Sequence, residues 1–252
     1  MSALMATDLS RNFGGVQALS HVSFTVQPGE RRLIIGPNGA GKTTLFNMLS
    51  GAFAVSSGSV ILFGRDITQL PAYERARMGL ARTFQITNLF PRLTVLENVL
   101  LALQAVDPSA FSLHRRMRAN HPLFHAADAL LEKWGLTAIA GKAAKEIAYG
   151  EQRQIDLILA MAMQPKVLLL DEPTAGLSAA EAIRVVGMIR SLPREITILM
   201  IEHDMDVAFA VADRITVLHQ GRLVAEGNVE AIRNHPQVKE IYLGADEPRR
   251  QC

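Results

Sequence analysis

The sequence has a single cysteine, Cys252, among 252 residues. One cysteine cannot form a disulfide within the chain, so the sequence suits a reducing compartment and must rely on a hydrophobic core. The chain is long enough to bury such a core as one large domain, or as a core with a smaller lobe. It shows no internal repeat and no low-complexity tract.

Positive charge is not in excess either, because 26 lysines and arginines stand against 24 aspartates and glutamates. Nucleic-acid binding usually needs a basic face, so we expect no nucleic-acid partner. The longest apolar runs, such as 167–170 and 196–201, are far below the ~20 residues of a membrane-spanning helix. The first residues lack the pattern of a secretory signal. Yet 49% of residues are hydrophobic, which predicts extensive buried structure and, in part, a docking surface.

Strand and helix patterns alternate in the last third of the chain. The run KVLLLDE predicts a buried strand, and EITILMIEH predicts the next one. Two capping boxes, Thr94 with Glu97 and Ser178 with Glu181, mark the starts of helices. A hairpin is predicted to turn at 220–221. Buried strands that alternate with helices indicate a largely parallel sheet covered on both faces.

We therefore predict an α/β fold with a mainly parallel sheet, an N-terminal antiparallel β subdomain and a helical lobe. One domain is expected to span residues 1–252. Its core, with the β subdomain, takes residues 1–84 and 164–252, and the helical lobe takes residues 85–163. Within the lobe, the segment HRRMR at 114–118 is predicted to be charged surface.

The segment GPNGAGKT matches the pattern G-x-x-x-x-G-K-[ST] between a strand-like and a helix-like stretch. Gly36, Gly39 and Gly41 let the backbone turn its amides inward around an anion. Lys42 can reach the β- and γ-phosphates of a nucleotide, and the Thr43 hydroxyl can bind Mg²⁺. The strand before this segment and the helix after it argue against a chance match in a turn. Kinases, GTPases and helicases all remain open at this point.

An acidic pair in VLLLDEP supplies the second half of such a site. Asp171 ends a buried strand, where it can hold Mg²⁺ through a water or together with Thr43. The carboxylate of Glu172 can polarise an attacking water. The alternative is that these two residues only begin a turn before Pro173. Because the phosphate loop is also present, the pattern favours catalysis.

Four further features of the sequence distinguish among the nucleotide-binding classes. They are the segment IAYGEQ at 147–152, Gln85 in TFQ, His203 in IEHD and Phe13 in RNFGG. Alone, a histidine or phenylalanine at such a place is more often structural. In their order and spacing they resemble the signature segment, Q-loop, switch histidine and adenine-stacking aromatic of the ABC ATPases.

This resemblance implies a P-loop NTPase core that binds ATP and Mg²⁺. Two such domains are expected to pair head to tail, with the phosphate loop of one facing the signature segment of the other. The family's catalytic positions correspond to Glu172, His203 and Gln85, and its metal positions to Thr43, Gln85 and Asp171. The family's ATP contacts correspond to Phe13, Gly36, Asn38, Gly39, Gly41, Lys42, Thr43, Thr44, Ala148, Gly150, Glu151 and Gln152.

The sequence departs from the usual family pattern at three positions. Ala148 stands where a serine hydroxyl normally contacts the γ-phosphate, Tyr149 replaces a glycine, and Ser178 replaces a common aspartate. These departures, and the ending NHPQVKEIYLG at 234–244, resemble the subgroup that takes up branched-chain amino acids. The departures are therefore interpreted as features of that subgroup.

The expected function is that of the ATP-hydrolysing subunit of an importer for branched-chain amino acids or similar small organic solutes. Its expected partners are an identical or paralogous ATP-binding subunit, two transmembrane permeases that dock around 87–100, and indirectly a solute-binding protein. This places the chain peripherally on the cytoplasmic face of the inner (plasma) membrane. The alternatives are an exporter subunit of the lipid or lipopolysaccharide type, a soluble ABC ATPase outside transport, and an inactive scaffold.

Overall fold

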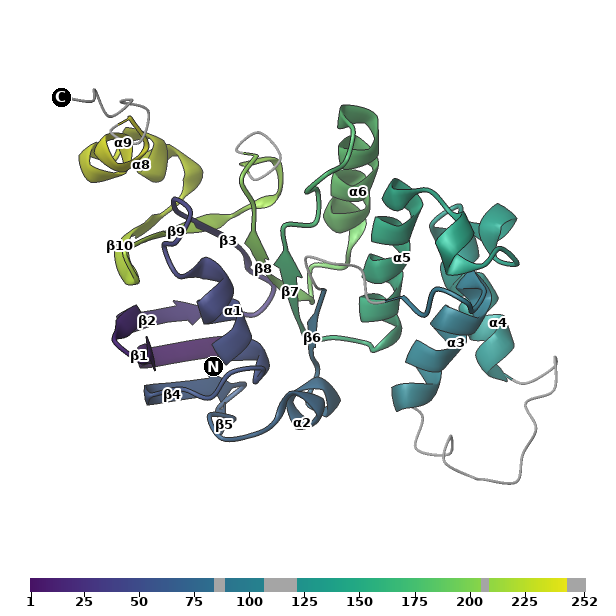
Figure 1. Cartoon of the computed structure of the whole chain (residues 1–252), viewed down its shortest axis with the longest axis horizontal. Helices are drawn as coiled ribbons and strands as arrows, with labels where there is room; N and C mark the ends of the chain where they lie inside the picture. Colours follow the sequence, from purple (N-terminus) through teal and green to yellow (C-terminus); the bar gives the residue numbers. More distant parts are fainter. Residues whose placement is uncertain (84–88, 107–121, 205–208, 244–252) are drawn as a thin grey trace.

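The computed structural model describes residues 1–83, 89–106, 122–204 and 209–243. These residues form two β-sheets and a set of helices, so the predicted α/β class is confirmed (Figure 1). The antiparallel sheet lies at one end of the molecule and helices α3 to α5 lie at the other (Figure 1). The parallel sheet lies between them.

The smaller sheet is antiparallel and has the strand order β2-β1-β4-β5. Its first two strands form a hairpin that turns at Gly14 and Gly15, and the pair next to this turn is Phe13 with Val16. This hairpin confirms the strands predicted at the start of the chain. The strands are β1 (Leu4–Phe13), β2 (Val16–Val26), β4 (Ser57–Leu62) and β5 (Arg65–Asp66).

The larger sheet has the strand order β10-β9-β3-β8-β7-β6. Neighbouring strands from β9 to β6 pair in parallel, and only β10 is antiparallel to its neighbour. The predicted hairpin turn at Gln220 and Gly221 joins β9 to β10. The strands are β3 (Arg31–Ile35), β6 (Leu80–Arg82), β7 (Val167–Asp171), β8 (Thr197–Ile201), β9 (Arg214–His219) and β10 (Arg222–Gly227).

Both faces of the parallel sheet are covered by apolar side chains. Along β7, Val167 and Leu169 belong to the hydrophobic cluster shared with α1 and the smaller sheet. Leu168 and Leu170 belong to the cluster shared with α3, α5 and α6. Successive strand residues point to opposite faces, so a strand buried on both sides must be apolar at every position. This explains the uninterrupted apolar run that precedes Asp171.

Both predicted capping boxes are present. The Glu97 carboxylate accepts hydrogen bonds from the Thr94 amide at 2.7 Å and hydroxyl at 2.9 Å. The Glu181 carboxylate accepts from the Ser178 amide at 2.9 Å and hydroxyl at 2.6 Å. The helices begin where these caps predict, because each cap satisfies amides that the first turn leaves unpaired.

The described helices include those of the region proposed as the helical lobe. That region contains α3, α4, two 3-10 turns and α5, and its segment 114–118 lies outside the described residues. The helices are α1 (Lys42–Ser50), α2 (Ala72–Arg77), α3 (Val95–Val106), α4 (Pro122–Lys133), η1 (Thr137–Ile139), η2 (Ala144–Glu146), α5 (Tyr149–Ala162), α6 (Ala179–Ser191), α8 (Val229–Asn234) and α9 (Pro236–Leu243).

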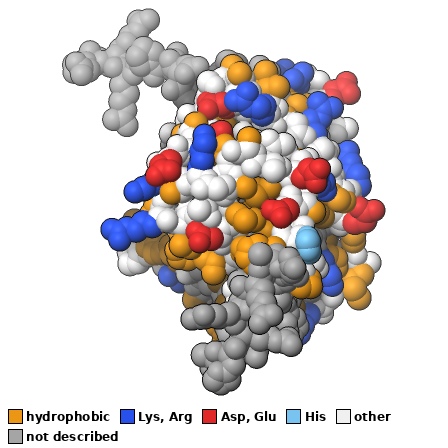
Figure 2. Space-filling model, turned by 90° about the vertical axis from the view of Figure 1, so that its right-hand side faces the viewer, with side chains coloured by type: hydrophobic (Ala, Val, Ile, Leu, Met, Phe, Trp, Pro, Cys, Tyr) orange, Lys and Arg blue, Asp and Glu red, His pale blue; other side chains and the backbone are white. Residues whose placement is uncertain are grey.

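The surface at the helical end carries charges of both signs. Figure 2 shows lysine and arginine side chains interspersed with aspartate and glutamate around a central group of hydrophobic side chains. Among the described residues, no helix has the length and apolar character needed to cross a membrane.

Candidate active site

The phosphate loop leaves the carboxyl end of β3 in the middle of the parallel sheet and leads into α1. At Gly36, an added Cβ would overlap the carbonyl oxygen of Leu218. At Gly41, which has φ 99°, an added Cβ would lie 2.7 Å from the carbonyl oxygen of Ala18. Only glycine fits such close backbone approaches, so these two residues fix the loop against β9 and β2.

Lys42 begins α1, and its ammonium turns back over the loop. Its Nζ donates hydrogen bonds to the carbonyl oxygens of Gly36 at 2.7 Å and Pro37 at 3.1 Å. Burial lowers the pKa of the Lys42 ammonium, while the nearby carboxylates of Glu172 and Asp171 raise it. A partly desolvated cation held only by neutral carbonyls can bind phosphate oxygens more strongly than it binds these partners.

A cavity of about 360 Å³ lies over the phosphate loop. It brings together the loop, the acidic end of β7 and the histidine that follows β8. The predicted site residues that line it are Asn38, Gly39, Gly41, Lys42, Thr43, Thr44, Glu172 and His203. Gly36 shapes the loop without lining this cavity.

Other lining residues were not predicted as site residues, and all of them except Ala40 lie outside the sequence motifs. They come from the start of β2, from the loop itself and from the β9–β10 turn: Val16, Gln17, Ala18, Ala40, Gln220 and Gly221. The Gly221 amide donates to the Ala40 carbonyl oxygen at 3.1 Å. Because β9 is the parallel neighbour of β3, the turn after it leaves the sheet beside the phosphate loop. The predicted hairpin could therefore have indicated Gln220 and Gly221.

Asp171 ends β7 with a side chain that is 2% exposed. Its Oδ2 atom accepts a hydrogen bond from Nη2 of Arg82 at 2.7 Å, which makes a buried ion pair. Its Oδ1 atom is buried and has no hydrogen-bond partner among the described residues. Sequence reasoning predicted the carboxylate but missed the arginine.

The oxygen atoms at this edge of the sheet fit Mg²⁺. The unpartnered Oδ1 of Asp171 and the hydroxyl of Thr43, an exposed residue in the first turn of α1, are the hard donors that this ion prefers. Mg²⁺ also commonly keeps waters and takes phosphate oxygens beside one or two protein oxygens. Gln85, the third predicted ligand, lies outside the described residues.

Glu172 and His203 meet at the carboxyl ends of β7 and β8. Nε2 of His203 lies 2.7 Å from Oε1 of Glu172. Glu172 has φ 49°, and its amide donates to the carbonyl oxygen of Ile201 at 3.0 Å. Such a left-handed conformation is strained for a residue other than glycine, and strain of this kind clusters at functional sites. A carboxylate in this place can accept a proton from a water near the phosphate loop.

Glu202 was not predicted, and it connects the segments that follow β7 and β8. Its Oε1 accepts hydrogen bonds from the Thr174 hydroxyl at 2.7 Å and amide at 3.0 Å, and its Oε2 accepts from the His203 amide at 3.2 Å. Burial raises the pKa of the Glu202 carboxyl, against the lowering effect of these hydrogen bonds. Glu202 thereby ties the segment after Glu172 to the segment that carries His203.

Phe13 does not line the cavity. Its ring packs edge to face on Phe53 with the centres 5.6 Å apart, and the guanidinium of Arg11 lies 4.7 Å from its centre. Its strand partner Val16 does line the cavity and is 68% exposed. The adenine-stacking role of Phe13 therefore stays a prediction.

The predicted signature segment forms the start of α5. The Ala148 amide donates to Oε2 of Glu151 at 2.9 Å, and the Tyr149 hydroxyl donates to the Ala175 carbonyl oxygen at 3.3 Å. Among the described residues that line the nucleotide cavity, none belongs to 147–152. The structure therefore does not bring Ala148, Gly150, Glu151 or Gln152 to the chain's own phosphate loop.

Gly150 packs against the capping glutamate of α6. A Cβ on Gly150 would overlap the Glu181 carboxylate. Hydrogen bonds from the Ser178 hydroxyl and amide lower the pKa of this carboxyl, and the Gly150 amide adds to the effect. Ser178 is the N-cap of α6, a role that serine and aspartate fill about equally well. The departure from aspartate at this position therefore preserves the cap.

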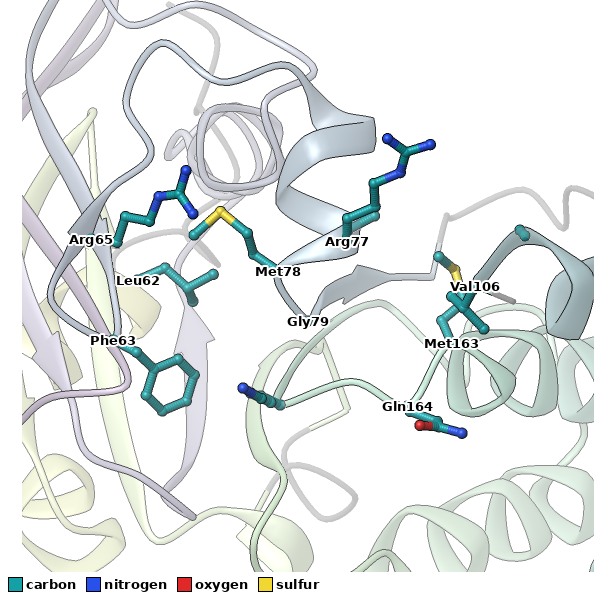
Figure 3. Close-up of a pocket in the computed structure, with 12 residues that line it drawn as sticks. Leu62, Phe63, Arg65, Arg77, Met78, Gly79, Val106, Met163 and Gln164 are labelled. Carbon is teal, nitrogen blue, oxygen red and sulfur yellow. The ribbon is translucent and has the colours of Figure 1, made fainter. Parts of the chain in front are cut away.

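A larger cavity, of about 790 Å³, lies away from these groups (Figure 3). Its walls come from β4 and β5, from α2, and from the C-terminal ends of α3 and α5. Phe63, Met78 and Val106 line it together with Arg65 and Arg77. Its described lining contains no carboxylate or hydroxyl side chain, whereas the smaller cavity contains both.

The fold and the smaller cavity define a class of protein. A phosphate loop between a strand and a helix, a buried aspartate at the end of a parallel strand and a glutamate beside a histidine are the parts of a P-loop nucleotide hydrolase.

Comparisons with known proteins narrow this class. The model of the ABC transporter family matches residues 19–175, and a model described as branched-chain amino acid ATP-binding cassette transporter matches residues 222–248. The high-affinity branched-chain amino acid transport ATP-binding protein LivG of Escherichia coli (strain K12) is 40% identical over 248 residues, which cover 96% of this chain and 97% of that protein.

Two solved structures agree with this comparison. A nucleotide-free ATP-binding cassette from an ABC transporter aligns with a TM-score of 0.85 and 31% identity, over 96% of this chain and 99% of that one. The ADP conformation of an ATP-binding cassette of an ABC transporter aligns with a TM-score of 0.84 and 30% identity, over 97% of this chain and 99% of that one. The chain belongs to the ABC transporter family as an ATP-binding, ATP-hydrolysing cassette.

Proposed function

We propose that the chain is the ATP-hydrolysing subunit of an importer for branched-chain amino acids or similar small organic solutes. The match of residues 222–248 to the branched-chain amino acid model carries this proposal. The described part of this segment forms β10, α8 and α9, and β10 pairs with β9 of the ATP-binding sheet. The name of the E. coli relative supports the same class of solute.

The phosphate loop would hold ATP through charge and backbone amides. Lys42 binds the β- and γ-phosphate oxygens, and the amides that follow Gly36, Gly39 and Gly41 surround them. Asn38 and Thr44 line the same space. Phe13 is proposed to stack on adenine, because its strand partner Val16 already lines the cavity.

The carboxylate and the histidine beside the loop would carry the hydrolytic step. Glu172 accepts a proton from the attacking water, and His203, 2.7 Å from it, contacts the γ-phosphate. Thr43, Asp171 and Gln85 would hold Mg²⁺, which when bound neutralises phosphate charge. The binding and positioning of the reactants account for most of the expected rate enhancement.

A second ATP-binding subunit, identical or paralogous, would complete each site. The reason is that the segment 147–152 carries the family signature but lines no part of the chain's own nucleotide cavity. In a head-to-tail pair, the N-terminus of α5 would face the γ-phosphate bound by the partner, and the Gly150 amide would exchange the Glu181 carboxylate for a phosphate oxygen. Release of that phosphate would open the pair.

Two permease subunits would receive this motion, with a solute-binding protein as an indirect partner. The proposed contact surface, 87–100, includes Phe90, whose side chain is 58% exposed. A single exposed apolar side chain is ordinary on a protein surface, so this docking surface is proposed from the family resemblance. The chain would then sit on the cytoplasmic face of the inner (plasma) membrane. No observation favours the exporter or the non-transport alternative.

An uptake measurement with Glu172→Gln tests the proposal. Glutamine keeps the size and the hydrogen-bond acceptor but cannot take a proton, so ATP binding should persist while turnover falls by roughly 10²–10⁴-fold. Cells that carry only this variant should lose uptake of labelled leucine, isoleucine and valine. The control is Glu195→Gln, which changes an exposed glutamate in the turn before β8. Uptake of all three at the wild-type rate by the Glu172→Gln cells would refute branched-chain amino acids as the solute.

A further inference from the structure

Arg82, at the end of β6, joins three elements around the metal-binding aspartate. Its Nη2 donates to Oδ2 of Asp171 at 2.7 Å, and its Nη1 donates to Oδ1 of Asn47 at 2.6 Å and to the Ser50 hydroxyl at 3.1 Å. The side chain is 6% exposed. One planar guanidinium therefore links β7 to the C-terminal half of α1.

The contacts on α1 lie on the helix face that carries the proposed metal ligand. Asn47 is four residues after Thr43, and Ser50 is seven residues after it. Residues at these spacings share one face of an α-helix. Arg82 thus holds Asp171 against the same face of α1 that presents the Thr43 hydroxyl one turn earlier.

The two carboxylate oxygens of Asp171 differ in their hydrogen-bond partners. Oδ2 is taken by Arg82, whereas Oδ1 is buried without a hydrogen-bond partner among the described residues. A buried carboxylate oxygen rarely stays unpaired in a protein unless a ligand or water completes it. The hydrogen bond from Nη2 holds Oδ2 while Nη1 is anchored on α1, so the guanidinium restricts the rotation of the carboxylate and the directions that Oδ1 can take.

We propose that Arg82 is a positioning residue for the metal of the nucleotide site. By clamping Oδ2 of Asp171 onto α1, it holds Oδ1 ready for Mg²⁺ or a Mg²⁺-bound water. This inference rests on the proposed role of Asp171 in the ATPase. It adds a residue that none of the predicted motifs includes.

Charge alone predicts the opposite effect of removing Arg82. A cation beside Asp171 reduces the attraction of this carboxylate for Mg²⁺, so its loss would strengthen metal binding if Coulomb interaction decided the outcome. Positioning predicts weaker metal binding, because a carboxylate freed from its clamp no longer presents Oδ1 in a fixed direction. Loss of a residue that orients a metal ligand typically costs 10–100-fold in metal affinity.

The test is the affinity for a fluorescent ATP analogue, measured with Mg²⁺ and with EDTA. The ratio of the two dissociation constants reports how much Mg²⁺ strengthens nucleotide binding, independently of hydrolysis. We expect Arg82→Gln to reduce the benefit of Mg²⁺ by roughly tenfold or more, with the affinity in EDTA unchanged. Arg82→Lys keeps the charge but has no fork that reaches Asp171 and Asn47 together, so an intermediate ratio is expected.

Arg75→Gln is the matched control. Arg75, on α2, is also buried and contacts the end of α1, but it donates to the carbonyl oxygens of Met48 and Leu49, both at 2.7 Å. Its loss should lower the melting temperature and leave the Mg²⁺ ratio unchanged. A merely structural Arg82 would behave in the same way.

Several results would overturn the inference. One is an unchanged or increased Mg²⁺ ratio in Arg82→Gln. Another is a wild-type ratio in Arg82→Lys, which would show that a positive charge supports metal binding without the fork of the guanidinium. If Arg82→Gln fails to fold, Asn47→Ala decides the matter, because it removes the clamp's anchor on α1 and should also lower the ratio. A wild-type protein whose ATP binding ignores Mg²⁺ would refute the proposed function itself, and this inference with it.

Discussion

At the scale of single residues, the nucleotide cavity places a buried cation next to paired acidic and imidazole groups. Lys42 is held by two loop carbonyls, and Glu172 lies 2.7 Å from His203. Each charged group is thus oriented before a nucleotide arrives. Pre-oriented groups lose less conformational entropy on binding, which favours both affinity and catalysis.

Replacement of Lys42 by alanine tests its part in binding. The change removes a charged donor to the phosphates, an interaction worth about 1.5–3 kcal/mol. We expect the dissociation constant for ATP to rise roughly 10- to 100-fold in a fluorescence titration. Circular dichroism of the same sample controls for folding. A folded Lys42→Ala protein with wild-type affinity would show that another group holds the phosphates.

Sequence motifs predicted which residues face the cavity better than they predicted what holds them. The phosphate loop pattern predicted Lys42 and Thr43, and the acidic strand end predicted Glu172, all of which line the cavity. Arg82 and Glu202 were missed, because a single arginine or glutamate in a strand end carries no pattern. Their roles arise from contacts between strands that lie far apart in the sequence, and such contacts depend on the strand order.

At the scale of elements, side-chain caps fix where α3 and α6 begin. Each cap pairs a hydroxyl residue with a glutamate three positions later, and both pairs form. The caps, the hairpin turns and the buried strand β7 were predictable because their signals are local. The packing of Tyr149 and Gly150 against residues 175–181 was not, since it joins α5 to the segment that follows β7.

The capping box of α3 makes a specific contribution to the pH dependence of stability. Hydrogen bonds from Thr94 lower the pKa of Glu97. A lowered pKa in the folded state means stabilisation that is present above the ordinary value of 4.5 and is lost as the pH falls through the folded-state pKa. Glu97→Gln should therefore have a lower melting temperature than wild type at pH 7, with the difference closing below about pH 4.

Thermal unfolding followed by circular dichroism across this pH range measures the effect. Glu195→Gln serves as the control, because Glu195 is an exposed turn residue and its replacement should cause little change at either pH. A difference between Glu97→Gln and wild type that stays constant from pH 7 to pH 3 would mean that the charge of Glu97 is not what supports the cap.

At the scale of the whole molecule, the predicted signature segment lies apart from the nucleotide cavity of the same chain. The phosphate loop, Glu172 and His203 line one cavity, and the segment 147–152 lies outside it. The parallel sheet and its covering helices could be predicted from the alternation of strands and helices. The separation of the signature segment from the cavity was expected only from the family resemblance, because no local pattern shows how the helical region packs against the sheet.

The similarity to branched-chain amino acid transport ATP-binding proteins is the basis for the proposed membrane partners. In the proposed importer, two permeases receive the motion of the paired ATP-binding subunits. We expect the chain to be purified as a complex when membranes are solubilised gently, rather than as an isolated cassette.

The most direct test is affinity purification of the tagged chain from detergent-solubilised membranes, with identification of every protein that co-purifies. The account predicts two multi-spanning permeases in amounts comparable to the chain itself, with a paralogous ATP-binding subunit if the pair is mixed. An untagged strain processed in parallel is the control. Recovery of the chain alone, or with nucleic acid and no membrane protein, would contradict the transport function and leave only the ATPase.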